Sequence, residues 1–213
     1  MISGHCFIAR RTTQRSCRTK IMPVVHFITH PEVVIDPEVP VQDWPLSPIG
    51  RQRAGAFLHR PWLRTVRAVF SSAERKATDM AHMLADHLGI APVIIDALGE
   101  NDRSATGYLP KAEFESVADA FFARPQESVR GWERAIDAQH RIVTAVDHAL
   151  SIAAVDGDVA IISHGGVGTL LLCHLKRTAI SRADDQPGDG GGNVYSFDAA
   201  TRTLLSGWRK IDV

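Results

Sequence analysis

Two short stretches decide the fold of this chain: Val159-Ala160-Ile161-Ile162-Ser163-His164-Gly165-Gly166 and Val24-Val25-His26-Phe27-Ile28-Thr29-His30-Pro31. Each is an apolar, largely β-branched run that reaches a histidine and then a glycine or a proline. A run of this kind predicts a buried strand that stops at the turn residue. His30 and His164 are therefore expected at the carboxyl ends of two strands, the edge where open α/β sheets bind ligands. Two imidazoles at that edge suit anion binding, a metal site or an activated nucleophile.

Strands and helices alternate along the rest of the chain. We expect strands at 23–29, 66–70, 93–95, 159–163, 194–197 and 203–208, and helices at about 48–60, 73–88, 110–123, 130–154 and 167–176. Ser47 and Pro48 are a typical helix start, and Gly89 is a typical helix stop. This order predicts an α/β fold, a three-layer sandwich with a mostly parallel central sheet flanked by helices. The last two strands predict a hairpin, and the glycine-rich loop 186–192 before them is expected over or beside the site.

Composition excludes several classes of function. The 213 residues carry 24 Lys and Arg against 24 Asp and Glu, so no net charge favours nucleic acid or a membrane surface. The sequence has no apolar run of 18 residues, so we expect no membrane-spanning helix. Cys6, Cys17 and Cys173 form neither a disulfide framework nor a metal motif, which favours a reducing, cytoplasmic location.

Residues 1–21 differ from the rest, because they hold five basic residues and no acidic one. The segment resembles an organelle presequence in composition, but it lacks the apolar core of a secretory signal. We expect a disordered basic extension, or an upstream start with Met22 as the functional start. Residues 22–213 are expected to form a single domain.

Polar side chains gather where the predicted strands end: His30, Arg75 in the Ser71–Arg75 stretch, Glu100 and His164. If the strands are parallel, these groups meet at one edge. A helix N-terminus and an arginine suit a phosphate, and a histidine can attack phosphorus to form a phosphohistidine. A carboxylate can protonate the leaving oxygen and later deprotonate water, so this chemistry needs no metal and no cofactor.

The same residues resemble the histidine phosphatase superfamily, in the branch that contains cofactor-dependent phosphoglycerate mutases. The family begins with Arg-His-Gly, which here is Thr29-His30-Pro31, and continues with a pattern similar to Pro45–Ala54. Its next motif is a Ser-Ser pair, three residues and an arginine with a nearby threonine; Ser71–Thr78 is similar, with Arg75 as the arginine. Glu100 follows Leu98 as the family acid does, and Ser163–Gly166 is similar to its closing Ser-His-Gly-Gly. Residues 125–128 resemble a family helix start.

The resemblance implies roles for these residues and a metal-independent phosphomonoester hydrolase. His30 is the nucleophile, Glu100 the proton donor and acceptor, and His164 binds the phosphoryl group. Arg75, Thr29 and the Gly165 N–H complete the predicted phosphate-binding set. The expected partner is a phosphorylated small molecule or a phosphoprotein.

Three departures from the family pattern weaken phosphate binding. Thr29 replaces an arginine with one neutral hydroxyl, Pro31 replaces glycine and removes an N–H, and Asp36 stands where many relatives have asparagine. Losing one well-placed donor costs about 3 kcal/mol, roughly 100-fold in rate. Arg103, close to Glu100 in the sequence, is our candidate to supply the missing charge. The alternative is a catalytically impaired member that binds a phosphorylated ligand or a partner protein.

A metal-dependent hydrolase with His30, His164 and Glu100 as ligands is a third interpretation. The sequence offers no local pair of ligands, such as two histidines one helical turn apart, to support it.

Overall fold

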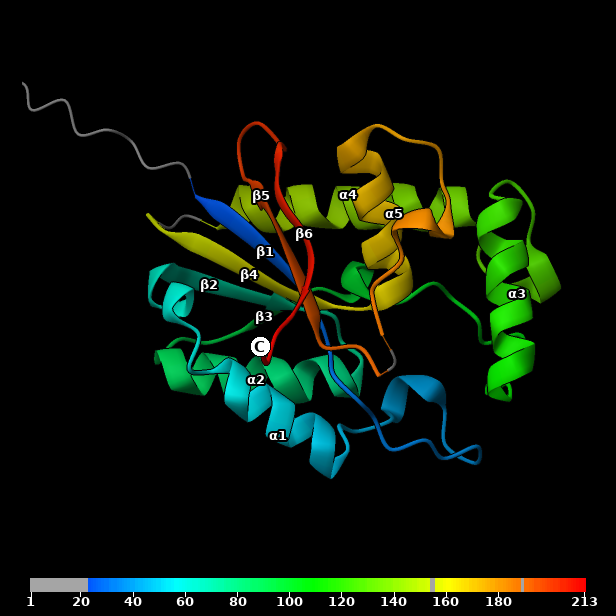
Figure 1. Cartoon of the computed structure of the whole chain (residues 1–213), viewed down its shortest axis with the longest axis horizontal. Coiled ribbons are helices and arrows are strands. Elements are labelled where there is room, and N and C mark those ends of the chain that lie inside the picture. Colours follow the sequence, from blue (N-terminus) through cyan, green and yellow to red (C-terminus); the bar gives the residue numbers. More distant parts are fainter. Residues whose placement is uncertain (1–22, 154–155, 189) are drawn as a thin grey trace, which may run out of the picture.

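The computed structural model describes residues 23–153, 156–188 and 190–213, and the basic segment 1–21 lies outside them. One six-stranded sheet runs through the structure in the order β3-β2-β4-β1-β5-β6 (Figure 1). The strands are β1 (Val24–Thr29), β2 (Val66–Ser71), β3 (Val93–Ile94), β4 (Asp158–Ser163), β5 (Asn193–Asp198) and β6 (Leu204–Lys210). The mostly parallel sheet of the sequence analysis is confirmed: β1, β4, β2 and β3 are parallel, and the β5–β6 hairpin adds two antiparallel strands.

The register of the two central strands brings the histidines together. Thr29 of β1 is paired with Ser163 of β4, so His30 and His164 leave the sheet at the same level. The His30 N–H donates to the Ser163 carbonyl at 3.2 Å, which fixes this arrangement.

Helices cover both faces of the sheet, as predicted (Figure 1). They are α1 (Pro48–Phe57), α2 (Arg75–Leu88), α3 (Lys111–Ala123), α4 (Ala135–Ile152) and α5 (Gly165–Lys176). Because side chains alternate along a strand, Phe27 packs with α4 and α5 on one face. Its neighbour Ile28 packs with α1 and α2 on the other face.

Two helix starts differ from the prediction. Helix α4 begins at Ala135 rather than at about 130, because Arg130 and Gly131 adopt positive φ angles of 54° and 81° in a short 3₁₀ turn. Helix α5 begins at Gly165, two residues early, so that His164 is its N-cap residue.

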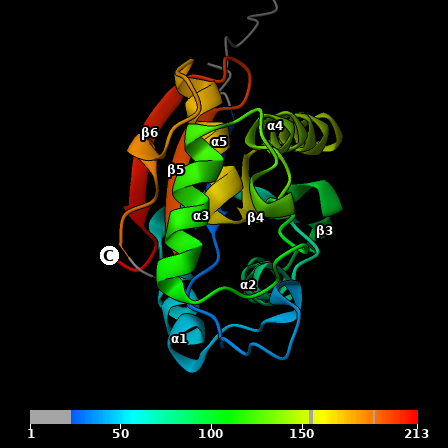
Figure 2. The ribbon, with the colours of Figure 1, turned by 90° about the vertical axis from the view of Figure 1, so that its right-hand side faces the viewer.

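Helix α3 stands apart from the two layers. Its apolar side chains form a third cluster with Trp132, the start of α4 and Leu170 of α5. Figures 1 and 2 place α3 beyond the carboxyl ends of the parallel strands. No helix in the described part of the chain is long and apolar enough to cross a membrane.

Candidate active site

His30 presents a bare ring nitrogen. Its Nδ1 lies 2.8 Å from the Pro31 carbonyl oxygen, which can only accept, so Nδ1 carries the proton and Nε2 keeps its lone pair. Burial lowers the pKa of His30 to about 4, and the charge of Lys76 adds to this effect. The imidazole is therefore neutral at pH 7, as a nitrogen nucleophile must be.

His164 lies close to His30 at the carboxyl ends of the paired strands β1 and β4, with ring centroids 5.2 Å apart. Its fully buried Nε2 lies 2.7 Å from the Ser72 hydroxyl and 3.3 Å from a Glu74 carboxylate oxygen. The carboxylate favours the tautomer with the proton on Nε2. Burial lowers the pKa of His164 well below its usual value, although Glu74 opposes this. His164 is thus a neutral donor rather than a permanent cation.

The cation beside the histidines is Lys76, not Arg75. Both residues begin α2, but the Arg75 side chain is exposed, whereas that of Lys76 is buried and donates to the Val41 carbonyl at 2.7 Å. The structure therefore does not bring Arg75 to the other predicted residues. Counting the three residues of the family motif from Ser72 leads to Lys76, and this spacing was the signal that the choice of Arg75 overlooked.

Glu74 belongs to the cluster, although the sequence analysis did not select it. One carboxylate oxygen forms an ion pair with Lys76, and the other accepts the Glu100 N–H at 2.8 Å. Burial raises the pKa of Glu74, but His164 and Lys76 outweigh it and bring the pKa to about 2. Glu74 therefore remains charged and balances the Lys76 ammonium.

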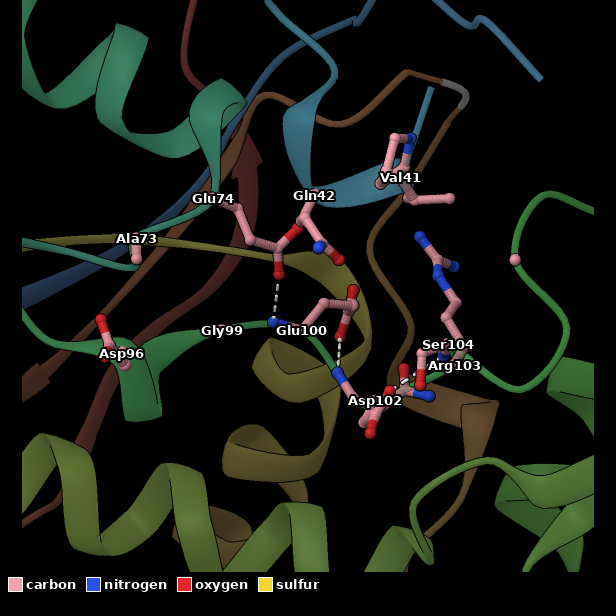
Figure 3. Close-up of a pocket in the computed structure, with 13 residues that line it drawn as sticks. Val41, Gln42, Ala73, Glu74, Asp96, Gly99, Glu100, Asp102, Arg103 and Ser104 are labelled. Atoms are coloured by element: carbon pink, nitrogen blue, oxygen red, sulfur yellow. Dashed lines mark hydrogen bonds between the residues drawn. The ribbon is translucent and has the colours of Figure 1, made fainter. Parts of the chain in front are cut away.

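Glu100 lies at the N-terminus of α5, the helix whose N-cap residue is His164. Its carboxylate accepts the N–H groups of Gly166 at 3.0 Å and Val167 at 2.9 Å, which fix its orientation. A Cβ on Gly166 would lie 2.7 Å from Glu100 Oε1, so a side chain there would displace the Glu100 carboxylate. Figure 3 shows Glu100 between Glu74 and Arg103, and all three line a cavity of about 500 Å³.

The Thr29 hydroxyl is hydrogen-bonded within the protein. This buried hydroxyl donates to Gln186 Oε1 at 2.8 Å and accepts the Asn193 N–H at 2.9 Å. The Gln186 amide packs against Gly165. A Cβ on Gly165 would lie only 2.1 Å from Gln186 Nε2. Within the described residues the Gly165 N–H has no acceptor, so it stays available as a donor.

Of the two remaining candidates, Arg103 lies near the histidines and Asp36 lies on the surface. The charge of Arg103 is close enough to lower the pKa of both His30 and His164, after the larger effect of burial. Its guanidinium lies 5.0 Å from the centre of the Phe114 ring. Asp36 is exposed and caps a turn through the Glu38 N–H, so it does not face the cluster.

In the parts of the chain that the structure describes, no group of three or more His, Cys, Asp or Glu side chains is arranged to hold a metal ion.

Comparison with known proteins gives the family. The model of the histidine phosphatase superfamily, branch 1, matches residues 30–205, and the chain belongs to this family. No match was found among curated protein sequences.

Two solved structures show how far the fold is shared. A mycobacterial glucosyl-3-phosphoglycerate phosphatase, solved with inorganic phosphate, has 20% identity over 90% of this chain and 99% of its own, with a TM-score of 0.70. The YhfR protein of Bacillus stearothermophilus has 23% identity over 86% of this chain and 95% of its own, with a TM-score of 0.69. At these identities the likeness shows the fold alone.

Proposed function

We propose that the chain is a metal-independent phosphomonoester hydrolase that works through a phosphohistidine on His30. The observation that carries this proposal is the hydrogen bond from His30 Nδ1 to the Pro31 carbonyl, which leaves Nε2 unprotonated on a ring that lies 5.2 Å from the His164 ring. Membership of the histidine phosphatase superfamily supports it.

The reaction has two steps. First, Nε2 of His30 attacks phosphorus, the bond from phosphorus to the ester oxygen breaks, and Glu100 gives its proton to the departing alcohol. Second, water attacks the phosphohistidine, the P–N bond breaks, and Glu100 takes the proton of the water. Free phosphate leaves, and His30 and Glu100 return to their starting states.

In this proposal, several side chains and one backbone N–H stabilise the negative charge on the phosphoryl group during its transfer. Lys76 and Arg103 supply positive charge and the Gly165 N–H supplies a neutral donor, while the Nε2–H of His164 is directed at Glu74 and Ser72 beside them. In this proposal Lys76 takes the role that the sequence analysis gave to Arg75. Thr29 acts indirectly, because its hydroxyl holds Gln186 against Gly165.

The test is the hydrolysis of nitrophenyl phosphate with a metal chelator present. We expect chelator-resistant turnover that falls by roughly 1,000-fold or more in His30→Ala. His82→Ala, which removes an exposed histidine of α2, is the matched control and should keep its rate. Unchanged activity in His30→Ala, or turnover that needs a divalent metal, would refute the proposal.

One observation favours a second function, a catalytically impaired member that binds a phosphorylated ligand or partner protein. The Thr29 hydroxyl is committed to Gln186 and Asn193, so this position adds no charge to the phosphate site. Thr29→Arg distinguishes the two functions. If the natural protein shows no turnover and Thr29→Arg gains it, the impaired interpretation holds; if the natural protein turns over and Thr29→Arg gains nothing, it fails.

Two further expectations remain proposals. Residues 22–213 act as one domain, supported by the single sheet that the described residues share. A cytoplasmic location is supported by Cys173, whose thiol is free and buried.

A further inference from the structure

A second, apolar cavity adjoins the site. It has a volume of about 360 Å³, and its walls come from the loop after β1 and from the segment between β3 and α3. Val41, Arg103 and Gly107 line both this cavity and the one in Figure 3, so the two are adjacent. The size lies at the lower end of the range of small-molecule pockets, about 300–1,000 Å³.

Aromatic rings form the walls of the apolar cavity. Trp44 and Tyr108 lie with ring centroids 5.9 Å apart, and Phe114 forms the third aromatic wall. The Trp44 indole N–H already donates to the Asp36 and Val39 carbonyls, so Trp44 offers the cavity its ring and no free donor. Ile35 and Tyr108 are left 59% and 37% exposed at this cavity, as is typical of a surface that a ligand covers.

The polar groups of the cavity do not suit a sugar. Glu115 is paired with Arg182 at 2.9 Å, and Arg182 also pairs with Asp119 and Asp185, so this carboxylate is held in an ion-pair network within the protein. The Arg103 guanidinium lies over the Phe114 ring and lends its charge to the histidines. Lys111 also lines the cavity and has an interaction of its own, which leaves the Tyr108 hydroxyl as a further polar group there. A polyhydroxylated leaving group needs several free donors and acceptors, whereas the rest of this cavity offers mainly rings and aliphatic carbon.

We propose that the substrates of this site are phosphate monoesters of aromatic alcohols, whose ring occupies the cavity formed by Trp44, Tyr108, Phe114 and Ile35. The proposal rests on the proposed function for the placement of the phosphoryl group at His30. Arg103 joins the two parts, because it lines the apolar cavity and its charge reaches both histidines.

Binding of non-hydrolysable phosphonates tests the proposal without turnover. We would measure the Kd of naphthylmethylphosphonate and of methylphosphonate by calorimetry, for the natural protein and for Ile35→Ala, Tyr108→Ala and Ile49→Ala. Ile49 is the matched control for Ile35, since it is 56% exposed and lies on α1 away from the cavity. Both cavity variants replace partly exposed side chains, so the fold is expected to tolerate them.

We expect the natural protein to bind the naphthyl compound at least tenfold more tightly than the methyl compound. Tyr108→Ala should weaken naphthyl binding by roughly tenfold, Ile35→Ala should weaken it less, and Ile49→Ala should leave it unchanged. Equal affinities, no binding of either compound, or a preference that survives both cavity variants would overturn the proposal.

Failure of this proposal and failure of the proposed function give different results. Tight naphthyl binding without any hydrolysis of naphthyl phosphate supports the aromatic subsite and refutes the hydrolase. Hydrolysis that is no faster for naphthyl phosphate than for butyl phosphate, together with equal phosphonate affinities, supports the hydrolase and refutes the subsite.

Discussion

Two neighbouring cations at the start of α2, Arg75 and Lys76, differ in burial. In the proposed function only the buried one stabilises charge on the phosphoryl group. Lys76 is 3% exposed beside Glu74 and the histidines, whereas Arg75 points to solvent. We therefore predict that Lys76→Met lowers kcat/KM for nitrophenyl phosphate by roughly 100-fold, the usual effect of losing one donor in a dry site. Arg75→Met should change it by less than about threefold, because exposed charges act weakly through water.

A double variant separates lost catalysis from damage to the site. Lys76→Met leaves the Glu74 carboxylate buried without its partner, which is itself destabilising. Lys76→Met combined with Glu74→Gln removes both charges, and kcat/KM should stay low while stability recovers. Equal effects of the Lys76 and Arg75 variants would show that the assignment of Lys76 is mistaken.

At the scale of single residues, the sequence allowed His30, Glu100 and His164 to be placed together, because all three follow predicted strands. The expected helix alone did not separate Arg75 from Lys76, since one step along a helix turns a side chain by about 100°, and only the motif spacing pointed to Lys76. Small errors in where α2 begins therefore change which residue faces the site. Glu74 was missed for the same reason.

Among the secondary-structure elements, helix starts with a local cap were predictable. Ser47 Oγ accepts the Gly50 N–H at 2.9 Å and donates to Glu32 at 2.8 Å, so it caps α1 and ties it to the loop after β1. Ser47→Ala should lower the free energy of unfolding by about 1 kcal/mol, measured by urea denaturation. Ser151→Ala, an exposed serine of α4, should change it by less than about 0.5 kcal/mol. A Ser47→Ala variant as stable as the natural protein would contradict this account of the cap.

Helix starts that depend on distant residues were not predictable. Helix α5 begins two residues early because Glu100, 66 positions before Gly166, accepts its N–H. No local pattern around Gly165 contains that information. The alternation of strands and helices sufficed for the parallel part of the sheet, but it gave no hint that α3 would stand beyond the strand ends.

For the molecule as a whole, Gly191 and Gly192 of the glycine-rich loop lie beside His30, the proposed nucleophile. Gly191 has a φ of 60°, and a Cβ there would lie 2.2 Å from the His30 carbonyl oxygen. The neighbouring Gly192 donates its N–H to the same oxygen at 2.9 Å. The loop thus holds the backbone at His30, a role that depends on folding across the whole chain.

Buried histidines make the stability of the whole molecule depend on pH. His26, which packs on Trp62 with ring centroids 4.0 Å apart, has its pKa lowered by burial to about 4, and burial also lowers the pKa of His164. Between pH 6.5 and 4 the unfolded chain therefore binds more protons than the folded one, so stability falls as the pH drops through this window. For His26 alone the loss is up to about 3 kcal/mol.

Urea denaturation at several pH values checks this prediction. The midpoint should fall steadily from pH 6.5 to 4.5, above the range in which Glu74 takes up its proton in the folded state. A midpoint that stays constant over this interval would contradict it.

The central claim is that the phosphoryl group of the substrate passes to His30, and trapping the phosphoenzyme tests it most directly. Glu100→Gln should slow the attack of water, while nitrophenol leaves without needing a proton, so the intermediate should accumulate. We would mix this variant with nitrophenyl phosphate, quench it in alkaline denaturant and locate the modification by mass spectrometry. The account predicts one phosphoryl group on His30, absent when His30→Ala is added and unaffected by His82→Ala. Turnover without a phosphoryl group on His30, or with the group on another residue, would contradict it.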